Sequence, residues 1–220
     1  MQKSNLLFRA KITEAQFAEI LRLFALDLNG CQIAGLLAIN RNTVNRYVMA
    51  IRRKIAQHCR RGGCWDSEQD AVCVNLVSGV RGRNPSMQHV LILLFEEEGY
   101  VFTEIVPQRF TGLMQGIMRG KVRADGVLEP LGLTNCRAIA NMGNKRIFHL
   151  QKGDGGRAKR AAISPVDRFW GIFKQRLVRM RGIKRSSLPY HLKECEFRFN
   201  NAHQDILTLL HDIVGNDHDC

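Results

Sequence analysis

The chain has few of the features that mark membrane or secreted proteins. In its 220 residues, no window approaches the roughly 18 consecutive apolar residues of a membrane-spanning helix, and the N-terminus lacks the long apolar stretch of a secretory signal. The seven cysteines are an odd number, and none stands in a Cys-x-x-Cys pair. We therefore expect a cytoplasmic protein with no membrane association and no disulfide framework.

Acidic residues are also scarce, and they are absent altogether between Leu28 and Trp65. Lys and Arg number 33 against 20 Asp and Glu, a net charge of +13. Residues 1–64 carry eleven basic and three acidic residues, and Arg157–Arg185 carries ten basic residues and one acid, whereas residues 65–156 are balanced. Two basic segments are typical of a protein that binds nucleic acid, with solvated helix faces as the alternative.

The first 60 residues are predicted to form three helices. Thr13 fits an N-cap, and Asn29-Gly30 is expected to close that first helix. A short helix follows from Cys31 to about Ile39, with Ile33, Leu36 and Leu37 on its apolar side. The third helix begins after Asn40-Arg41-Asn42, and its apolar positions recur at spacings of three and four residues: Val44, Tyr47, Val48, Ile51 and Ile55.

The opposite face of the third helix is polar and basic. A helix, a short helix, a tight turn and such a third helix form a helix-turn-helix, whose third helix enters the major groove of DNA. Arg and Asn side chains can pair with guanine and adenine edges there. The candidate DNA-binding residues are Arg41, Asn42, Thr43, Asn45, Arg46, Arg52 and Arg53. A plain helical bundle, which shows the same apolar spacing, is the alternative.

From residue 66 the hydrophobic pattern changes to that of strands. Strands are predicted at 71–77, 89–95, 99–106, 126–131 and 146–150, helices at 110–119 and 134–142, a basic loop at 151–162, and three helices near 165–180, 188–200 and 203–214. This order is that of a ribonuclease-H-like fold. We predict an α/β protein: a helix-turn-helix domain over 1–60, then a ribonuclease-H-like mixed sheet flanked by helices over 65–215. In the second basic segment, Lys159, Arg160, Lys174 and Arg176 are candidate phosphate contacts.

Several motifs of the second half occur together and in order. Phe169-Trp170-Gly171-x2-Lys174-x2-Leu177 is followed by Gly182-Ile183 and by the block His191–Asn200, which reads HLKECEFRFN. Upstream stand Arg81-Gly82-Arg83 and Tyr100–Pro107. Together they resemble small bacterial insertion-sequence transposases of the DDE type. The resemblance implies a nucleoid-associated DNA strand transferase that binds terminal inverted repeats and target DNA as a homodimer or larger assembly.

The resemblance also implies an active site in which three acids hold two divalent cations, Mg²⁺ or Mn²⁺. It places Glu68 at the first acidic position, Leu131 at the second and Asp167 at the third, with Lys174 as a helper lysine two helical turns after Asp167. Glu129, two residues before Leu131, would point to the same side of a strand and is a candidate replacement, with a surface or salt-bridged role as the favoured alternative. The implied catalytic residues are Glu68, Asp167 and Lys174, and the implied metal ligands are Glu68, Asp167 and Glu129.

Two functions remain open at this point. Leu131 cannot bind a cation, and Glu68 and Asp167 each shift a carboxylate by one methylene from the family pattern, whereas Mg²⁺ demands near-ideal octahedral geometry. The chain is therefore either a transposase with altered acidic positions or a catalytically dead helix-turn-helix DNA-binding protein or repressor derived from one. A regulator with an unrelated C-terminal sensor is disfavoured by the block His191–Asn200.

Overall fold

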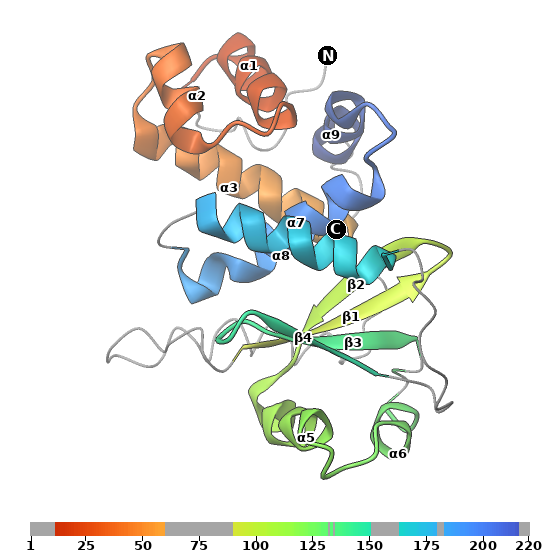
Figure 1. The fold of residues 1–220 in the computed structure, drawn as a ribbon. Helices are drawn as coiled ribbons and strands as arrows, with labels where there is room; N and C mark the ends of the chain where they lie inside the picture. The colour runs from red at the N-terminus through yellow and green to blue at the C-terminus, as the bar shows by residue number, and fades with distance from the viewer. Residues whose placement is uncertain are drawn as a thin grey trace. The chain divides into compact units, whose positions relative to one another are not determined.

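The computed structural model describes residues 12–59, 90–131, 133, 135–150, 163–179 and 183–215. The predicted strand at 71–77 and the predicted basic loop at 151–162 lie outside the described residues, and so do Glu68, Lys159 and Arg160. The chain divides into two compact units, each considered separately below (Figure 1). The first unit combines residues 1–60 with residues 201–220, and the second covers residues 61–200.

Four helices make up the described part of the first unit: α1 (Glu14–Ala25), α2 (Gly30–Leu37), α3 (Arg41–His58) and α9 (Ile206–Gly215). Thr13 caps α1 as predicted, in a reciprocal capping box with Gln16. The prediction that Asn29-Gly30 closes the first helix was wrong. Asn29 instead begins α2, because its side-chain oxygen accepts hydrogen bonds from the backbone N–H groups of Cys31 and Gln32.

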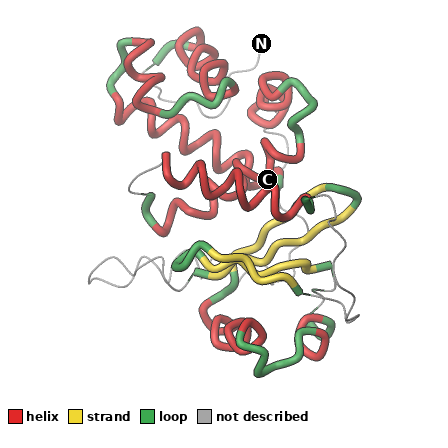
Figure 2. The backbone as a smooth tube through the Cα atoms, viewed as in Figure 1, coloured by secondary structure: helices red, strands yellow, loops and turns green. Residues whose placement is uncertain are grey.

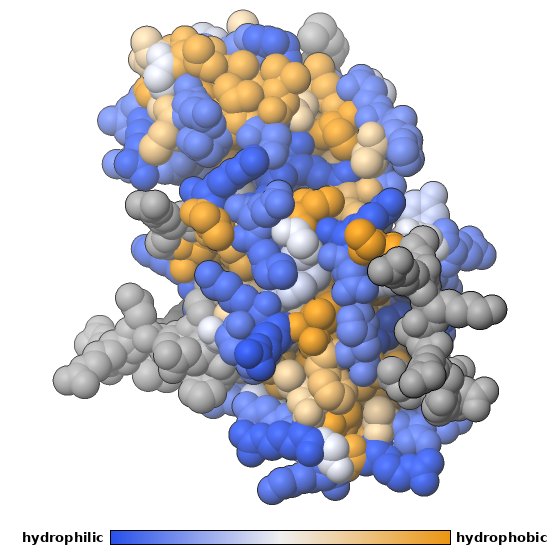
Figure 3. All heavy atoms as spheres, in the orientation of Figure 1, coloured by the Kyte–Doolittle hydropathy of each residue, from blue (hydrophilic) through white to orange (hydrophobic). Residues whose placement is uncertain are grey.

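The core of the first unit confirms the amphipathic prediction for α3. All five predicted apolar positions are buried: Val44, Tyr47, Val48, Ile51 and Ile55. On α2, Ile33 is buried, but Leu36 is 65% exposed, which corrects its predicted place on the apolar side. Apolar side chains gather over α1 and α2 on the face drawn in Figure 3. Helix α9, which follows the second unit in the sequence, packs on α1 and α3 and buries Leu210 and Val214.

The second unit is built on a four-stranded antiparallel sheet in the order β2-β1-β3-β4 (Figure 2). The strands are β1 (Leu91–Glu97), β2 (Tyr100–Ile105), β3 (Cys136–Asn141) and β4 (Arg146–His149). Strands β1 and β2 form a hairpin whose two-residue turn, Glu98-Gly99, has positive φ angles of 51° and 84°. A tight turn of this kind matches the twist of the strands and favours glycine, so the predicted strands at 89–95 and 99–106 are confirmed as a pair.

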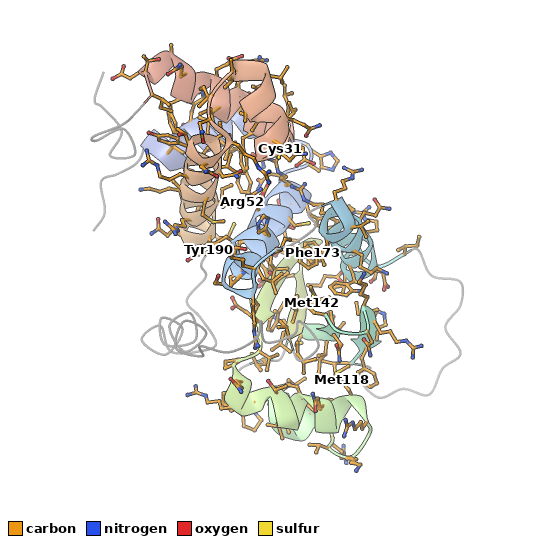
Figure 4. All side chains as sticks on the ribbon, turned by 90° about the vertical axis from the view of Figure 1, so that its left-hand side faces the viewer. Cys31, Arg52, Met118, Met142, Phe173 and Tyr190 are labelled. Atoms are coloured by element: carbon orange, nitrogen blue, oxygen red, sulfur yellow. The ribbon has the colours of Figure 1, made fainter. Side chains whose placement is uncertain are left out.

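Helices cover both faces of this sheet (Figure 1). Ile92 and Leu94 of β1 face one core with α7 (Pro165–Arg179) and α8 (Leu188–Asn200), and a 3-10 turn at Arg185–Ser187 precedes α8. Leu91 and Leu93 face the other core with α5 (Gln108–Met118) and α6 (Asp125–Leu128). Three of the side chains labelled in Figure 4 mark the two cores: Phe173 and Met142 belong to the first, and Met118 packs against the second.

Two predicted elements of the second unit were wrong. The segment 126–131, predicted as a strand, contains the end of helix α6, and the segment 134–142, predicted as a helix, contains strand β3. Strand β3 pairs with β1 on one side and β4 on the other, and Ala138, Ile139 and Ala140 are all fully buried. A strand buried on both faces loses the apolar-polar alternation that identifies strands, and its alanines favour helix.

The described residues therefore form a mixed α/β protein whose four-stranded antiparallel sheet is flanked by helices. The helices α1, α2 and α3 precede this sheet in the sequence. The finer ribonuclease-H-like topology depends in part on the segment 71–77 and stays a prediction. No helix within the described ranges is long and apolar enough to cross a membrane.

Candidate nucleic-acid interface

Helix α3 exposes the polar face that the sequence predicted for DNA. Its 18 residues span about 27 Å at 1.5 Å per residue. Five of the seven candidate residues are exposed, and Thr43 and Arg52 are partly buried; the exposed ones are Arg41, Asn42, Asn45, Arg46 and Arg53. Asn42, Arg46 and Arg53 lie directly opposite the buried stripe of the helix, at spacings of four and seven residues.

The charge of this helix is of one sign. Its basic residues are Arg41, Arg46, Arg52, Arg53 and Lys54, and it contains no Asp or Glu. The short helix α2 likewise lacks acidic residues. A helix with five basic side chains and no acid produces a positive potential that attracts phosphate groups.

Two of the candidate arginines contact aromatic rings of the first unit. The Arg46 guanidinium carbon lies 5.2 Å from the centroid of the Tyr47 ring, and Arg46 Nη2 lies 3.3 Å from the Tyr47 hydroxyl. The Arg52 guanidinium carbon lies 5.8 Å from the centroid of the Phe24 ring, and Figure 4 labels Arg52 on α3. Both are cation–π contacts, which restrict the directions that the two side chains sample.

Asn45 has a different position from its neighbours. Its side-chain oxygen lies so close to Gly30, the first residue of α2, that a Cβ atom on Gly30 would collide with it. Glycine at this position therefore lets α2 and the Asn45 side chain approach each other. The structure places Asn45 at the contact between α2 and α3.

The implied catalytic position Asp167 lies in the first turn of α7, as predicted for a late helix. The Ser164 hydroxyl donates to Asp167 Oδ2 at 2.9 Å and accepts from the Asp167 backbone N–H at 3.2 Å. His149 Nε2, at the end of β4, lies 3.1 Å from Asp167 Oδ1. Both carboxylate oxygens thus contact protein side chains that join β4 to the start of α7.

The other implied ligands do not gather around Asp167. Leu131 packs against the apolar core that the sheet shares with α5 and α6. Glu129 is exposed at the end of α6, so its predicted place on a strand beside Leu131 was wrong. Within the described ranges, no group of three or more His, Cys, Asp or Glu side chains could hold a metal ion. Of the implied metal ligands, Asp167 and Glu129 are among the described residues and Glu68 lies outside them.

The candidate phosphate contacts of the second basic segment differ in their surroundings. Lys174 is partly exposed on α7, two turns after Asp167. Arg176 is only 12% exposed, and its Nη2 donates to Glu194 Oε1 of α8 at 2.9 Å. Arg198 Nε donates to the same oxygen at 3.0 Å. This buried ion pair joins α7 to α8 and leaves Arg176 little surface for DNA.

The block His191–Asn200 forms most of α8, and no role was predicted for its polar residues. Three of them, at spacings of three and four residues, bind strand β2: Lys193, Glu196 and Asn200. Lys193 Nζ donates to the Thr103 carbonyl at 2.7 Å, and Glu196 Oε2 accepts from the Thr103 backbone N–H at 2.9 Å and from its hydroxyl at 2.6 Å. One sequence signal could have predicted these contacts: polar side chains recur at helical spacing among apolar residues that are buried.

Burial raises the pKa of the Glu196 carboxyl above its ordinary value, because the charged form loses its hydration. The ammonium group of Lys193, 3.0 Å from Glu196 Oε2, and the bonds from Thr103 act in the opposite direction and offset part of that rise. The carboxyl therefore serves to bind the strand edge within the protein. Glu196 and Lys193 are structural residues in this arrangement.

A comparison with curated proteins relates this chain to a transposase-like protein. An "Uncharacterized transposase-like protein" of Haemophilus influenzae is 27% identical over 104 residues, which is 46% of this chain and 82% of that protein. No family model matches the chain, and no solved structure matches it. The similarity suggests a transposase-related protein, at a distance that leaves its chemistry to be inferred from its residues.

Proposed function

We propose that this transposase-related protein binds double-stranded DNA through α3, with the terminal inverted repeats of its element as the implied target. The observation that carries the proposal is the exposed face of α3, where Asn42, Arg46 and Arg53 lie opposite the buried stripe and no acid is present. A helix of this composition fits the major groove and supplies the side chains that pair with adenine and guanine.

The candidate residues divide into three roles within this proposal. Asn42 and Arg46 read base edges, since both are exposed on the side of α3 opposite its buried stripe. Arg41, Thr43, Arg52 and Arg53 contact phosphates, which fix the position of the helix without reading sequence. Asn45 holds α2 against α3 through its contact with Gly30. In the second unit, Lys174 is the phosphate contact, together with Lys159 and Arg160.

Catalysis of strand transfer is the second candidate function, and the spacing of Asp167 and Lys174 on α7 favours it. In that case the protein acts as a DDE-type transposase with Mg²⁺ or Mn²⁺, as a homodimer or larger assembly on two DNA ends. Two observations favour DNA binding without catalysis. Ser164 and His149 contact the carboxylate of Asp167, and Leu131 packs against an apolar core. We therefore propose that DNA binding is retained and that strand cleavage is weak or absent.

A binding selection tests the proposal. The full chain is incubated with duplexes that carry a randomised central segment, and the bound fraction is sequenced. We expect one sequence to be enriched, and Arg46→Ala to weaken its binding by about 1–3 kcal/mol. Arg22→Ala is the matched control, because Arg22 is an exposed arginine of the same unit that pairs with Glu19 on α1. Equal binding by Arg46→Ala, Arg22→Ala and the parent would refute the proposal.

A further inference from the structure

The side chain of Tyr47 joins the core of the first unit to its proposed DNA-binding face. Tyr47 is only 3% exposed, and its ring lies 5.8 Å from the ring of Phe17 on α1, tilted by 60°. The ring is therefore anchored by core packing. Its hydroxyl nevertheless reaches the neighbouring exposed residue, 3.3 Å from Arg46 Nη2.

Arg46 contacts this anchored ring in two ways. Its guanidinium carbon lies 5.2 Å from the ring centroid, and one of its nitrogens donates to the hydroxyl. An exposed arginine otherwise samples many rotamers and loses that freedom when it binds a base. A guanidinium that is already restrained loses less conformational entropy when it binds DNA. Its planar N–H donors are also held in one orientation, which suits a base with two acceptors.

We infer that Tyr47 is a positioning residue, which orients the Arg46 guanidinium for recognition of one base pair. The inference rests on the proposed function of α3. Discrimination at the base pair that Arg46 contacts then depends on two side chains, Arg46 and Tyr47, and only Arg46 contacts DNA. Because guanine offers two acceptors in the major groove, guanine is the base expected at that position.

The test is Tyr47→Phe, which deletes the hydroxyl and keeps the ring on Phe17. Loss of one hydrogen bond predicts an affinity about two- to tenfold lower for the duplex that the parent enriches. Affinity for a scrambled duplex and the melting temperature should not change. In the Arg46→Ala background, Tyr47→Phe should have no further effect, because the group it positions is gone.

A second variant keeps the test independent of the folding of Tyr47→Phe. Arg46→Lys retains the charge without the planar donors, and it should lose discrimination between guanine and the other bases at the same position. If Arg46→Ala weakens binding while Tyr47→Phe does not, Tyr47 has no positioning role and DNA binding by α3 stands. If Tyr47→Phe weakens binding equally with and without Arg46, the inference is also wrong. If none of the α3 variants changes affinity, both the inference and the proposed function fail.

Discussion

The side-chain amide of Asn200, at the end of α8, pairs with both backbone groups of Val101 on strand β2. Asn200 Oδ1 accepts from the Val101 N–H at 2.9 Å, and Asn200 Nδ2 donates to the Val101 carbonyl at 2.8 Å. Together with the bonds of Lys193 and Glu196 to Thr103, the pairing satisfies backbone groups of β2, which is an outer strand of the sheet within the described residues. An edge strand with unpaired backbone groups invites aggregation, so α8 protects the sheet.

Replacing Asn200 by Ala should destabilise the protein by about 1–3 kcal/mol, because it leaves a backbone donor and acceptor of Val101 without their partner. Chemical denaturation measures the change as a lower midpoint. Gln175→Ala, an exposed position of α7, is the control and should change the midpoint little. Equal midpoints for the two variants would show that the pairing contributes nothing to stability.

Glu196 should make stability depend on pH. Because burial raises its pKa in the folded state, the folded protein holds this proton more tightly than the unfolded chain does. Its contribution to the unfolding free energy is therefore complete below the ordinary glutamate pKa of about 4.3 and declines as pH rises through the folded pKa.

Glu196→Gln cannot ionise and should remove this dependence. The unfolding free energy of the parent minus that of the variant should be smaller near neutral pH than at about pH 4. Denaturation of both proteins at the two pH values gives the comparison. A difference that stays constant, or that grows toward neutral pH, would show that Lys193 and Thr103 hold the carboxyl in its charged form.

Substitutions of Arg176 and Lys174 should have different effects, the first on stability and the second on DNA binding. Arg176→Ala breaks a buried ion pair, while Glu194 keeps its bond from Arg198, so a loss of about 1–3 kcal/mol is expected. Lys174→Ala should leave stability unchanged and lower the slope of log affinity against log salt by about one. An unchanged slope for Lys174→Ala would place that side chain on a solvated helix face.

Removal of α9 should unfold the first unit. Leu210 and Val214 of α9 are buried, and the helix packs on α1 and α3. A chain that ends at Asn200 exposes that apolar surface, and we expect weaker protection of the α3 amides in hydrogen exchange and loss of DNA binding. A truncated chain that binds DNA as the parent does would show that α1–α3 suffice.

Local patterns could predict the helices of this chain better than its sheet or its site. The stripe of α3 was predictable because one face is buried and the other is exposed. Strand β3 was not, since its burial on both faces removes the alternation. The pairing of Asn200 with Val101 joins residues 99 positions apart, so no local pattern contains it. The resemblance singled out the block His191–Asn200, and only the structure shows that its polar residues bind the edge of β2.

The altered acidic positions predict a protein that binds DNA without cutting it. In Mg²⁺ or Mn²⁺, the parent should bind the enriched duplex and leave both strands intact, because Leu131 stands at the second acidic position and both oxygens of Asp167 contact Ser164 and His149. Leu131→Asp should not restore cleavage, since the partly buried side chain at position 131 packs against an apolar core. Cleavage by the parent that Asp167→Ala abolishes would instead establish an active transposase.

The contact between α3 and DNA can be observed directly with a photo-crosslinking amino acid at Met49. This residue lies on the polar face between Arg46 and Arg53, so its replacement keeps the proposed contacts. We expect irradiation to join position 49 to the enriched duplex, and excess unlabelled duplex of the same sequence to suppress the product. A crosslinker at Asp212, exposed on α9, is the control and should give none. A bound duplex that crosslinks from position 212 and not from position 49 would contradict DNA recognition by α3.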